Sequence, residues 1–578
     1  MDYKIRNLGM IGDRQSGALI DINGDICWYC PEQFDSPSFF GSLLDGEKGG
    51  VWSLEINEKF RVKRKYIGNS NIIESRFKSG SGSFILTDWM PMQDDFAGIC
   101  RLFSPTSLKV TNRIIPAPGY AREKVSLKWN GDNSIIVNDK YYLTFSHQPR
   151  ISDENIFFDL PSGEEAWAVL SGKELGEKPD DKIKGSLKKT GEAWDEIATH
   201  VSYKGPYQEE VYDSLRAIRQ LTHEESGGIV AALTTSLPEI PGGERNYDYR
   251  YVWLRDASMI VSALTRAGSK GDDEKSFLDF ICSSRENIQD YSTTPFVTIH
   301  RKPAPPEQYL DFSGYMDSKP VRIGNNANEQ LQLDAGSNIL LAAKLIYENY
   351  NIKSHWDTVE EISSFLVSNW QRDDYGIWEE DIARQFTSSK VIMAVALEYI
   401  SAHSTDKGQK QLWQETAARI RDFIQEECIT SSGAYAVFAG SEEVDITSAL
   451  FPEWAFCEAD TPEMVQTIAE LEAGFCKNNL VYRNLLLFDE RKEGAFLAAS
   501  FWMAQYWIMR DDYDKSKNYI DAALKYKNDL GLFSEEADPE SDMMLGNIPQ
   551  SFVHASFIGA AIDFNVAFGK PTKNSEIH

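Results

Sequence analysis

The chain has 578 residues, too many for one ordinary domain, and its 42% hydrophobic and 12% aromatic content is that of a globular protein. Lys and Arg number 59 against 88 Asp and Glu, which gives a formal net charge of −29. A surface of that sign repels nucleic-acid phosphates and anionic lipid headgroups. The composition therefore disfavours a nucleic-acid partner and a membrane-surface role.

The cysteines indicate a reducing compartment. There are seven, an odd number scattered through a chain long enough to need no disulfides. Cys27 and Cys30 have CxxC spacing, but they follow a hairpin signal at Asn23-Gly24 and no second pair exists for a zinc ribbon, so we interpret them as structural. No apolar run of signal-peptide or membrane-span length is visible. We therefore expect a cytoplasmic protein.

The first part of the chain is strand-like. Short segments rich in β-branched and aromatic residues are separated by Gly, Asn, Asp and Ser, a pattern typical of an antiparallel β-sandwich. We predict a sandwich domain over residues 1–190, followed by a linker helix at 191–205. The clearest strand candidates are 16–22, 24–30, 50–56, 59–67, 82–90 and 140–146.

From residue 206 the apolar period becomes helical, and we predict an all-α domain over 206–572. Several candidates form pairs joined by short loops, and no repeat of fixed period argues for a solenoid. About a dozen helices in hairpins can close into a double ring whose end loops line a central pit. The candidates are 206–223, 253–268, 273–287, 335–350, 358–371, 388–403, 409–428, 461–476, 494–511, 513–527 and 551–569, with a weaker one at 445–456.

Aromatic and charged residues are interleaved in the loop 241–259, just before a predicted helix. Arg255 and Asp256 are adjacent, and a buried pair of this kind needs hydrogen-bonding partners. Sugar hydroxyls supply donors and acceptors for such a pair, while the rings of Tyr249 and Trp253 can cover the apolar face of a pyranose. The alternative is a helix start with an aromatic core beneath it.

Two further loops place paired carboxylates after a Gly-aliphatic-aromatic turn. "GIWEED" contains Trp378 and Glu379, and "GLFSEEADP" contains Ser534 and Glu535. Hydrolysis of a glycosidic bond requires one protonated and one ionised carboxyl. An apolar Trp378 would raise the pKa of Glu379, and more polar surroundings would leave Glu535 ionised. The alternative is a pair of solvated acid runs favoured by the helix dipole.

The loops occur together in a recognisable order. The segments "RNYDYRYVWLRDAS", "PVRIGNNANEQLQLD", "YGIWEE", "SSKV" and "GLFSEEADP…LGNIPQSFVH" follow a strand-rich region that opens with "RNLGMIGDRQSGALIDINGDICWYC". This combination resembles glycoside hydrolase family 15, the glucoamylase family, over nearly the whole chain. The resemblance implies a multidomain fold with an N-terminal β-sandwich and an (α/α)6 barrel. It also implies anomer-inverting, exo-acting release of glucose from non-reducing ends.

The resemblance assigns roles to individual residues. It implies that Glu379 is the general acid and Glu535 the general base, and that Arg255 and Asp256 grip hydroxyls of the terminal glucose. Tyr249 corresponds to an aromatic residue near the reacting sugar. The same pocket is expected to hold the residues that remain candidates for contact with substrate, namely Trp253, Trp378 and Arg322.

This chain departs from many relatives after the turn, where they have WEVRG and it has Glu380, Asp381 and Ile382. Glu380 therefore stays a rival for the acid role, and Glu536 stays a rival for the base. The polar loop 319–334 is either a pit-lining loop or a turn with an Asn cap, and loop 300–312 is either an entrance loop or a surface excursion. The histidines show no HExxH spacing, and we expect no metal and no cofactor.

Three functions follow from these observations. The first is hydrolysis of α-gluco-oligosaccharides by a glucoamylase-type enzyme. The alternative is hydrolysis of α,α-trehalose by the same machinery, and the third possibility is a carbohydrate-binding protein without turnover. In each case the partner is a small carbohydrate, and the oligomeric state cannot be read from the sequence.

Overall fold

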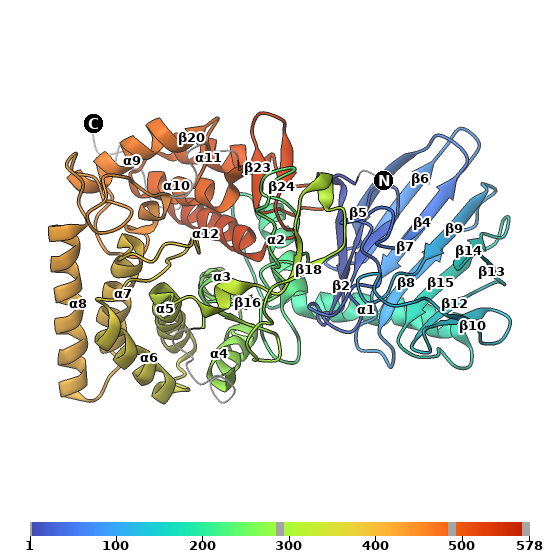
Figure 1. Cartoon of the computed structure of the whole chain (residues 1–578), viewed down its shortest axis with the longest axis horizontal. Helices are drawn as coiled ribbons and strands as arrows, with labels where there is room; N and C mark the ends of the chain where they lie inside the picture. Colours follow the sequence, from blue (N-terminus) through green and yellow to red (C-terminus); the bar gives the residue numbers. More distant parts are fainter. Residues whose placement is uncertain (1–2, 285–293, 484–492, 569–578) are drawn as a thin grey trace, which may run out of the picture.

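The computed structural model describes residues 3–284, 294–483 and 493–568. Strands gather at one end of the long axis and helices at the other (Figure 1). The N-terminal β-sandwich is therefore followed by a separate helical domain, as the sequence predicts.

The N-terminal part consists of two antiparallel sheets. Its strands are β1 (Gly9–Gly12), β2 (Gly17–Ile20), β3 (Ile26–Tyr29), β4 (Val51–Ile56), β5 (Arg61–Tyr66), β6 (Ile73–Lys78), β7 (Ser83–Trp89), β8 (Gly98–Phe103), β9 (Val110–Ile115), β10 (Leu127–Trp129), β11 (Ser134–Val137), β12 (Tyr141–Phe145), β13 (Arg150–Ser152), β14 (Asn155–Asp159) and β15 (Ala166–Ser171). One sheet has the order β1-β2-β3-β4-β9-β14-β13 and the other β10-β11-β12-β15-β8-β7-β6-β5. Trp52 and Ile114 from the first sheet share one buried core with Leu86 and Phe103 from the second. Alternate residues of each strand thus face the partner sheet.

A long helix covers the outer face of the eight-stranded sheet. Helix α1 (Pro179–Ala198) packs there through Ile183, and its Ser186 accepts a hydrogen bond from the indole of Trp89 at 3.2 Å. The sequence predicts a linker helix at 191–205, but the observed helix begins twelve residues earlier. A proline at the first helical position with acidic residues in the first turn marks that earlier start.

Strands β1 to β3 are buried on both faces, which explains their nearly continuous apolar sequence. One face belongs to the core of the sandwich. The other places Met10, Leu19 and Trp28 in the same core as Leu215 and Leu233 of the helical part. The two parts of the chain are therefore joined by a shared apolar interface.

The C-terminal part is a barrel of inner and outer helical segments. In the described residues these are α2 (Gln208–Leu221), α3 (Leu254–Arg266), α4 (Asp272–Ser284), α5 (Leu333–Tyr350), α6 (Trp356–Asn369), α7 (Thr387–Ser401), α8 (Lys407–Glu427), the 3-10 segment η5 (Ile446–Leu450), α9 (Pro462–Phe475), α10 (Leu497–Met509), α11 (Tyr513–Leu524) and α12 (Ser551–Phe568). Segments α3, α5, α7, η5, α10 and α12 form the inner ring, and the others pack outside it. Inner helices such as α7 and α10 are buried on nearly all sides, whereas outer helices such as α8 bury one face. This alternation is an (α/α)6 barrel.

The fourth inner segment is much shorter than its neighbours. The sequence suggests a weak helix at 445–456, but η5 covers only Ile446–Leu450. Pro452 follows directly, and a proline in the interior of a helix removes a hydrogen bond and clashes with the preceding turn. The segment therefore cannot continue as an α-helix.

Short strands connect the helices at the end of the barrel that carries the site. In the described residues they are β16 (Val252–Trp253), β17 (Phe296–Val297), β18 (Gln308–Leu310), β19 (Val321–Ile323), β20 (Cys476–Lys477), β21 (Leu480–Val481), β22 (Ala495–Phe496), β23 (Glu536–Asp538) and β24 (Met543–Leu545).

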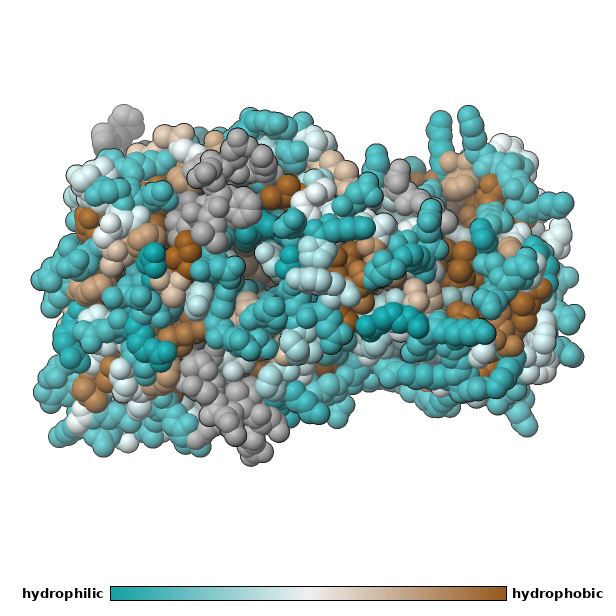
Figure 2. Space-filling view, viewed as in Figure 1, coloured by the Kyte–Doolittle hydropathy of each residue, from teal (hydrophilic) through white to brown (hydrophobic). Residues whose placement is uncertain are grey.

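Hydrophilic side chains cover most of the face shown in Figure 2, with hydrophobic ones in small scattered groups. Among the described helices, none is long and apolar enough to cross a bilayer. Cys27 and Cys30 are buried thiols rather than a disulfide.

Candidate active site

One pocket at an end of the barrel collects residues from the three loops that the sequence analysis singled out. The loop 241–259 contributes the end of its coil and the start of α3, the turn after α6 contributes residues 377–379, and the segment before β23 contributes Glu535. Helix α12 adds its N-terminal residues. The side chains that line the pocket include Tyr249, Trp253, Arg255, Asp256, Trp378, Glu379, Arg483, Phe496, Glu535, Gln550 and Phe552.

Glu379 is held in a strained turn. Its φ of 58° lies in the left-handed region, which a non-glycine residue adopts at a cost that functional sites often carry. Its Oε1 accepts hydrogen bonds from Trp253 Nε1 at 2.7 Å and Gln332 Nε2 at 3.0 Å, and lies 3.5 Å from Arg255 Nη2. Burial raises the pKa of Glu379, while the nearby Arg255 opposes that shift. All three donors reach the same oxygen, which leaves Oε2 as the atom that can carry a proton.

Glu535 is almost completely buried. Its Oε1 accepts a hydrogen bond from the hydroxyl of Tyr249 at 2.8 Å, whereas no described residue donates to its Oε2. Burial, reinforced by the charge of Glu239, raises the pKa of Glu535 to about 8. The surroundings of Glu535 are therefore not the polar ones expected from the sequence, and its ionised form is favoured instead by the charge of Arg483 and by the hydrogen bond from Tyr249. The Ser534 hydroxyl points elsewhere and donates to the carbonyl of Glu536 at 2.9 Å.

An aromatic pair connects the two carboxyls. The rings of Tyr249 and Trp253 meet edge to face with centroids 5.5 Å apart. Tyr249 donates to Glu535 and Trp253 donates to Glu379, so each ring orients one acid. The indole against Glu379 is thus that of Trp253 rather than Trp378, whose Nε1 donates to Asp445 at 2.7 Å.

Arg255 and Asp256 form a buried ion pair on the wall of the pocket. Arg255 Nε lies 2.8 Å from Asp256 Oδ1, and Arg255 Nη1 donates to Gln332 at 3.0 Å. Arg255 also lies 3.7 Å from Asp334. Burial raises the pKa of Asp256, and the guanidinium of Arg255 opposes the rise. The pair offers fixed donors and acceptors to a polar ligand in the pocket.

The second acid of each pair does not line the pocket. Glu380 lies 3.5 Å from the guanidinium of Arg245, and Glu536 lies 3.3 Å from that of Arg483. Successive residues of a strand point to opposite sides, so Glu536 at the start of β23 diverges from its neighbour. The geometry therefore favours Glu379 and Glu535 over these rivals.

A network of acids and arginines lies behind Glu535. Glu239, Glu493 and Glu536 hold carboxylate oxygens within 4.8 Å of one another. The guanidinium of Arg483 lies among them, at 2.6 Å from Glu239 and 2.8 Å from Glu493. Arg245 adds a second cation at 2.7 Å from Glu239. Arginine thus supplies the positive charge that this acidic cluster requires.

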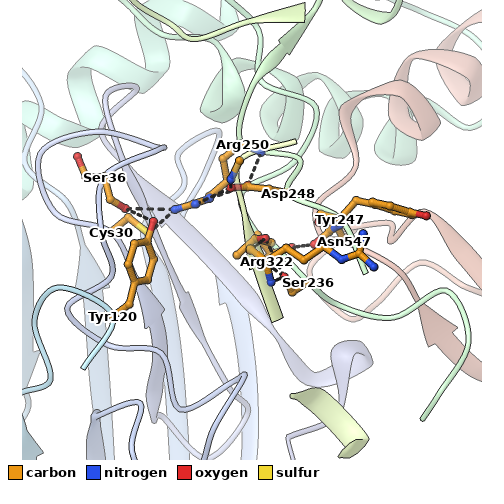
Figure 3. A network of polar contacts seen from close by, with 12 residues as sticks. Cys30, Ser36, Tyr120, Ser236, Tyr247, Asp248, Arg250, Arg322 and Asn547 are labelled. Carbon is orange, nitrogen blue, oxygen red and sulfur yellow. Dashed lines mark hydrogen bonds and ion pairs between the residues drawn. The ribbon is translucent and has the colours of Figure 1, made fainter. Parts of the chain in front are cut away.

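Arg322 is not brought to the pocket. Its side chain lies over the ring of Tyr247, at 4.9 Å from the centroid (Figure 3). It also pairs with Glu307 at 3.2 Å. Its backbone N–H donates to Ser236 at 2.7 Å. These contacts fix β19 against the barrel. Arg322 is therefore not among the residues that line the pocket, where the sequence predicts it.

Two residues that line the pocket or orient the acid, Arg483 and Gln332, were not predicted from the sequence. Arg483 stands in "LVYRN", which carries no turn or helix signal, and only the fold brings it to Glu535. Gln332 belongs to the loop 319–334, which also contributes Gln330. Gln330 Nε2 donates to the carbonyl of Glu379 at 3.1 Å, so this loop wraps the turn that holds the acid.

Comparisons with known proteins find relatives along almost the whole chain. A trehalase from Thermoplasma volcanium is 28% identical over 98% of this chain and 95% of its own length. Trehalase 2 of Sulfolobus acidocaldarius is 29% identical over 94% of this chain and 97% of its own length. A bacterial glucoamylase complexed with acarbose superimposes with a TM-score of 0.74 at 13% identity, covering 98% of this chain and 96% of that one.

Two family models match the chain in succession. The model described as "Trehalase-like, N-terminal" matches residues 2–146. The model "Glycosyl hydrolases family 15" matches residues 205–518 and 514–562, which is more than half of the chain and includes every residue that lines the pocket. The chain is a glycoside hydrolase and belongs to glycosyl hydrolase family 15.

Proposed function

We propose that this enzyme hydrolyses α,α-trehalose to two molecules of glucose, with inversion at the glucose that occupies the pocket. The observation that supports this choice is similarity to trehalases along almost the whole chain, sandwich included. The glucoamylase structure is 13% identical and supports the fold alone. The relatives therefore favour trehalose over the α-gluco-oligosaccharides that the sequence analysis preferred.

Glu379 is the general acid of the proposed mechanism. The N–H donors of Trp253, Gln332 and Arg255 all converge on its Oε1, so its proton resides on Oε2. Burial raises the pKa of the carboxyl and favours this protonated form. The proton passes to the bridging oxygen as the bond between that oxygen and the anomeric carbon breaks.

Glu535 is the general base. Its Oε1 is held by Tyr249, and its Oε2 accepts no hydrogen bond from the described residues, so Oε2 can accept a proton from water. The water oxygen bonds to the anomeric carbon on the face opposite the leaving glucose. Inverting enzymes separate their carboxyls by about 6.5–9.5 Å to admit this water, and we expect that separation for Glu379 and Glu535.

Arg255 and Asp256 hold the reacting glucose. Together they present guanidinium donors and carboxylate acceptors at one wall of the pocket, which suits vicinal hydroxyls. Their mutual pairing at 2.8 Å fixes both groups before substrate enters, so little ordering entropy is lost on binding.

The substrate is tested by the rates of glucose release from trehalose, maltose, maltotriose and isomaltose. We expect the highest kcat/KM for trehalose, and no release by the Glu379→Gln and Glu535→Gln variants. A higher kcat/KM for maltose or maltotriose would overturn the trehalase proposal and would favour hydrolysis of α-gluco-oligosaccharides instead.

The stereochemistry is tested by NMR in ¹⁸O-labelled water, before the products mutarotate: the proton spectrum identifies the anomers, and the isotope shift of C1 in the carbon-13 spectrum shows which anomer carries ¹⁸O. Inversion gives β-glucose from the attacked ring, while the leaving glucose keeps its α configuration. We therefore expect equal initial amounts of the two anomers, with the label only in β-glucose. Label in α-glucose alone would mean retention and would remove the base role from Glu535.

A further inference from the structure

A second cavity lies on the barrel axis beyond the catalytic pocket. Its volume is about 380 Å³, compared with about 60 Å³ for the catalytic pocket. Every segment of the inner ring, from α3 to α12, contributes to its wall. We name it the axial cavity.

The axial cavity and the catalytic pocket lie at different depths along the same helices. On α3, Asp256 lines the pocket, whereas Met259 and Arg266 line the cavity. Ten residues of α-helix span about 15 Å, which places Arg266 well below the catalytic acids. The cavity therefore belongs to the opposite half of the barrel.

An aromatic layer separates the two spaces. Phe552 lines both, and its ring lies 5.7 Å from that of Trp502 and 6.3 Å from that of Phe496. Trp378 closes the layer at 5.5 Å from Phe496 and 6.2 Å from Trp502. A ligand in the cavity would contact the underside of this layer, not the catalytic carboxyls.

The cavity exists because one inner segment is short. The 3-10 segment η5 ends at Leu450, and the chain then turns through Pro452 instead of continuing down the ring. Glu453 and Trp454 after this turn line the cavity in place of a continued helix.

The wall combines flat aromatic faces with hydrogen-bonding groups. Trp454 and Tyr399 offer the rings. The amides of Asn338 and Gln505 each make one hydrogen bond, to the carbonyl of Asp334 and to Asp563, and keep a second N–H and the amide oxygen for a ligand. Small-molecule sites typically have this mixture, with volumes of about 300–1,000 Å³. A pyranose, whose C–H face is apolar and whose rim carries hydroxyls, matches both kinds of group.

The charges at the cavity are paired. Arg266 lies 2.7 Å from Glu453 and also contacts Asp563. Lys344 pairs with Glu348 at 3.0 Å and lies over the ring of Tyr399. An ionic ligand would have to break one of these pairs, whereas a neutral ligand can hydrogen-bond to them as they stand.

We propose that the axial cavity is a second carbohydrate site, which binds a neutral polyhydroxylated molecule of monosaccharide to disaccharide size. It is distinct from the catalytic pocket, and its existence does not depend on the choice of trehalose as substrate.

The proposal is tested by ¹⁹F NMR of the full chain labelled with 5-fluorotryptophan, titrated with D-glucose. Trp253 reports on the catalytic pocket and Trp454 on the axial cavity, while the exposed Trp129 of the sandwich is the control. Replacement of each tryptophan by Phe assigns its resonance. We expect saturable shifts of Trp253 and Trp454 and none of Trp129.

Two variants fill the cavity without touching the catalytic residues. Both Gly559 and Ala263 line it, and a Cβ on Gly559 would point at the Gln505 amide at 3.3 Å. In Gly559→Leu and Ala263→Leu we expect the Trp454 shift to be lost while the Trp253 shift, which also reports correct folding, is retained.

Glucose bound in the catalytic pocket could shift the Trp454 resonance indirectly. The Asp256→Ala variant tests for this effect, because it weakens glucose binding in the catalytic pocket and leaves the axial cavity unchanged. The Trp454 shift should persist in this variant at the same glucose concentrations. Loss of that shift in Asp256→Ala, its survival in both filled variants, or its absence from the unmodified chain would each overturn the second site.

Discussion

At the scale of single residues, the hydroxyl of Tyr249 controls the proposed base. It donates to Glu535 Oε1 at 2.8 Å, and this bond lowers the pKa of a carboxyl whose pKa burial raises. A hydrogen bond to a charged group contributes about 1.5–3 kcal/mol, so we expect Tyr249→Phe to reduce kcat/KM roughly 10- to 150-fold. The ascending limb of the pH profile should move to higher pH, because the base then deprotonates less readily.

The control for this change is Tyr251→Phe in the same loop. The ring of Tyr251 stacks near Phe296 with centroids 6.1 Å apart, and the residue does not line the pocket. Equal losses in kcat/KM and equal pH profiles for the two variants would show that the Tyr249 hydroxyl has no special role.

The charge of Glu239 acts on Glu535 from behind the pocket. After burial, it is the largest cause of the raised pKa of Glu535, while Arg483 opposes it. In Glu239→Gln the carboxylate is removed and Arg483 remains, so the pKa of Glu535 should fall. We expect the ascending limb of kcat/KM against pH to move to lower pH.

An exposed acid of the same loop provides the comparison. Glu244→Gln removes the same formal charge at the surface, where solvent screens it, and should leave the pH profile unchanged. An unmoved limb in Glu239→Gln, or an equal movement in both variants, would contradict the electrostatic role given to Glu239.

From the sequence, the general acid is either Glu379 or Glu380 and the general base is either Glu535 or Glu536. Physical arguments from the sequence alone could not choose between the two residues of each pair. The choice depends on the left-handed φ of Glu379 and on the alternation of side chains at Glu535 and Glu536, which are properties of the folded backbone. For the same reason the indole beside Glu379 was assigned to its neighbour Trp378 in the chain rather than to the distant Trp253.

At the scale of elements, the hairpin of β23 and β24 fixes the base. Gly546, at φ 71° just after β24, donates its N–H to Pro238 at 2.8 Å. A Cβ at this position would lie 2.8 Å from both Cβ and Oε2 of Glu535. We expect Gly546→Ala to displace that carboxyl and lower kcat by at least about 100-fold, since small misplacements of a catalytic group have costs of that order.

Gly433 offers a matched control. Its φ of 89° carries a similar backbone penalty for alanine, but a Cβ there would meet no atom within 4 Å. Gly433→Ala should therefore lower the melting temperature without lowering kcat. If both variants lose only stability, the close contact between Gly546 and Glu535 does not limit catalysis.

The helices could be predicted well because their apolar faces recur every three or four residues. The predicted segments 388–403 and 409–428, for example, became α7 (Thr387–Ser401) and α8 (Lys407–Glu427). The failures have local causes. Pro452 shortened η5, and the start of α1 at Pro179 was hidden because its apolar residues face a sheet rather than another helix.

At the scale of the whole molecule, the sandwich and the barrel share an interface that sequence patterns cannot show. Residues of β1 to β3 pack against parts of the barrel domain about two hundred positions away, and Trp28 donates to the carbonyl of Leu233 in the connection between α2 and α3 at 3.0 Å. Because β1 to β3 are buried on both faces, their sequences show no alternation of apolar and polar residues. Nothing in the sequence therefore shows which face of these strands packs against the barrel.

Arg250 is the charged centre of this interface. It extends from the barrel loop to the sandwich, where it donates to the carbonyl of Ser36 at 3.1 Å and faces Tyr120 (Figure 3). Its guanidinium makes two bonds to buried Asp248, at 2.8 and 2.7 Å. Since Tyr249 stands between these two residues in the chain, the interface also positions the loop that orients the base.

Arg250→Ala should therefore weaken both stability and catalysis. It leaves Asp248 buried without its partner, a change that typically costs about 3–5 kcal/mol of unfolding free energy.

Arg101→Ala is the matched control, because Arg101 and Asp88 form an equally buried pair inside the sandwich, 2.8 Å apart. Hydrogen exchange should accelerate in β1 to β3 and in the loop 241–250 for Arg250→Ala, but around β7 and β8 for Arg101→Ala. At temperatures where both variants remain folded, only Arg250→Ala should lower kcat/KM, because only this arginine is attached to the loop of Tyr249. Equal activity in the two variants would show that the sandwich stabilises the barrel without positioning its site.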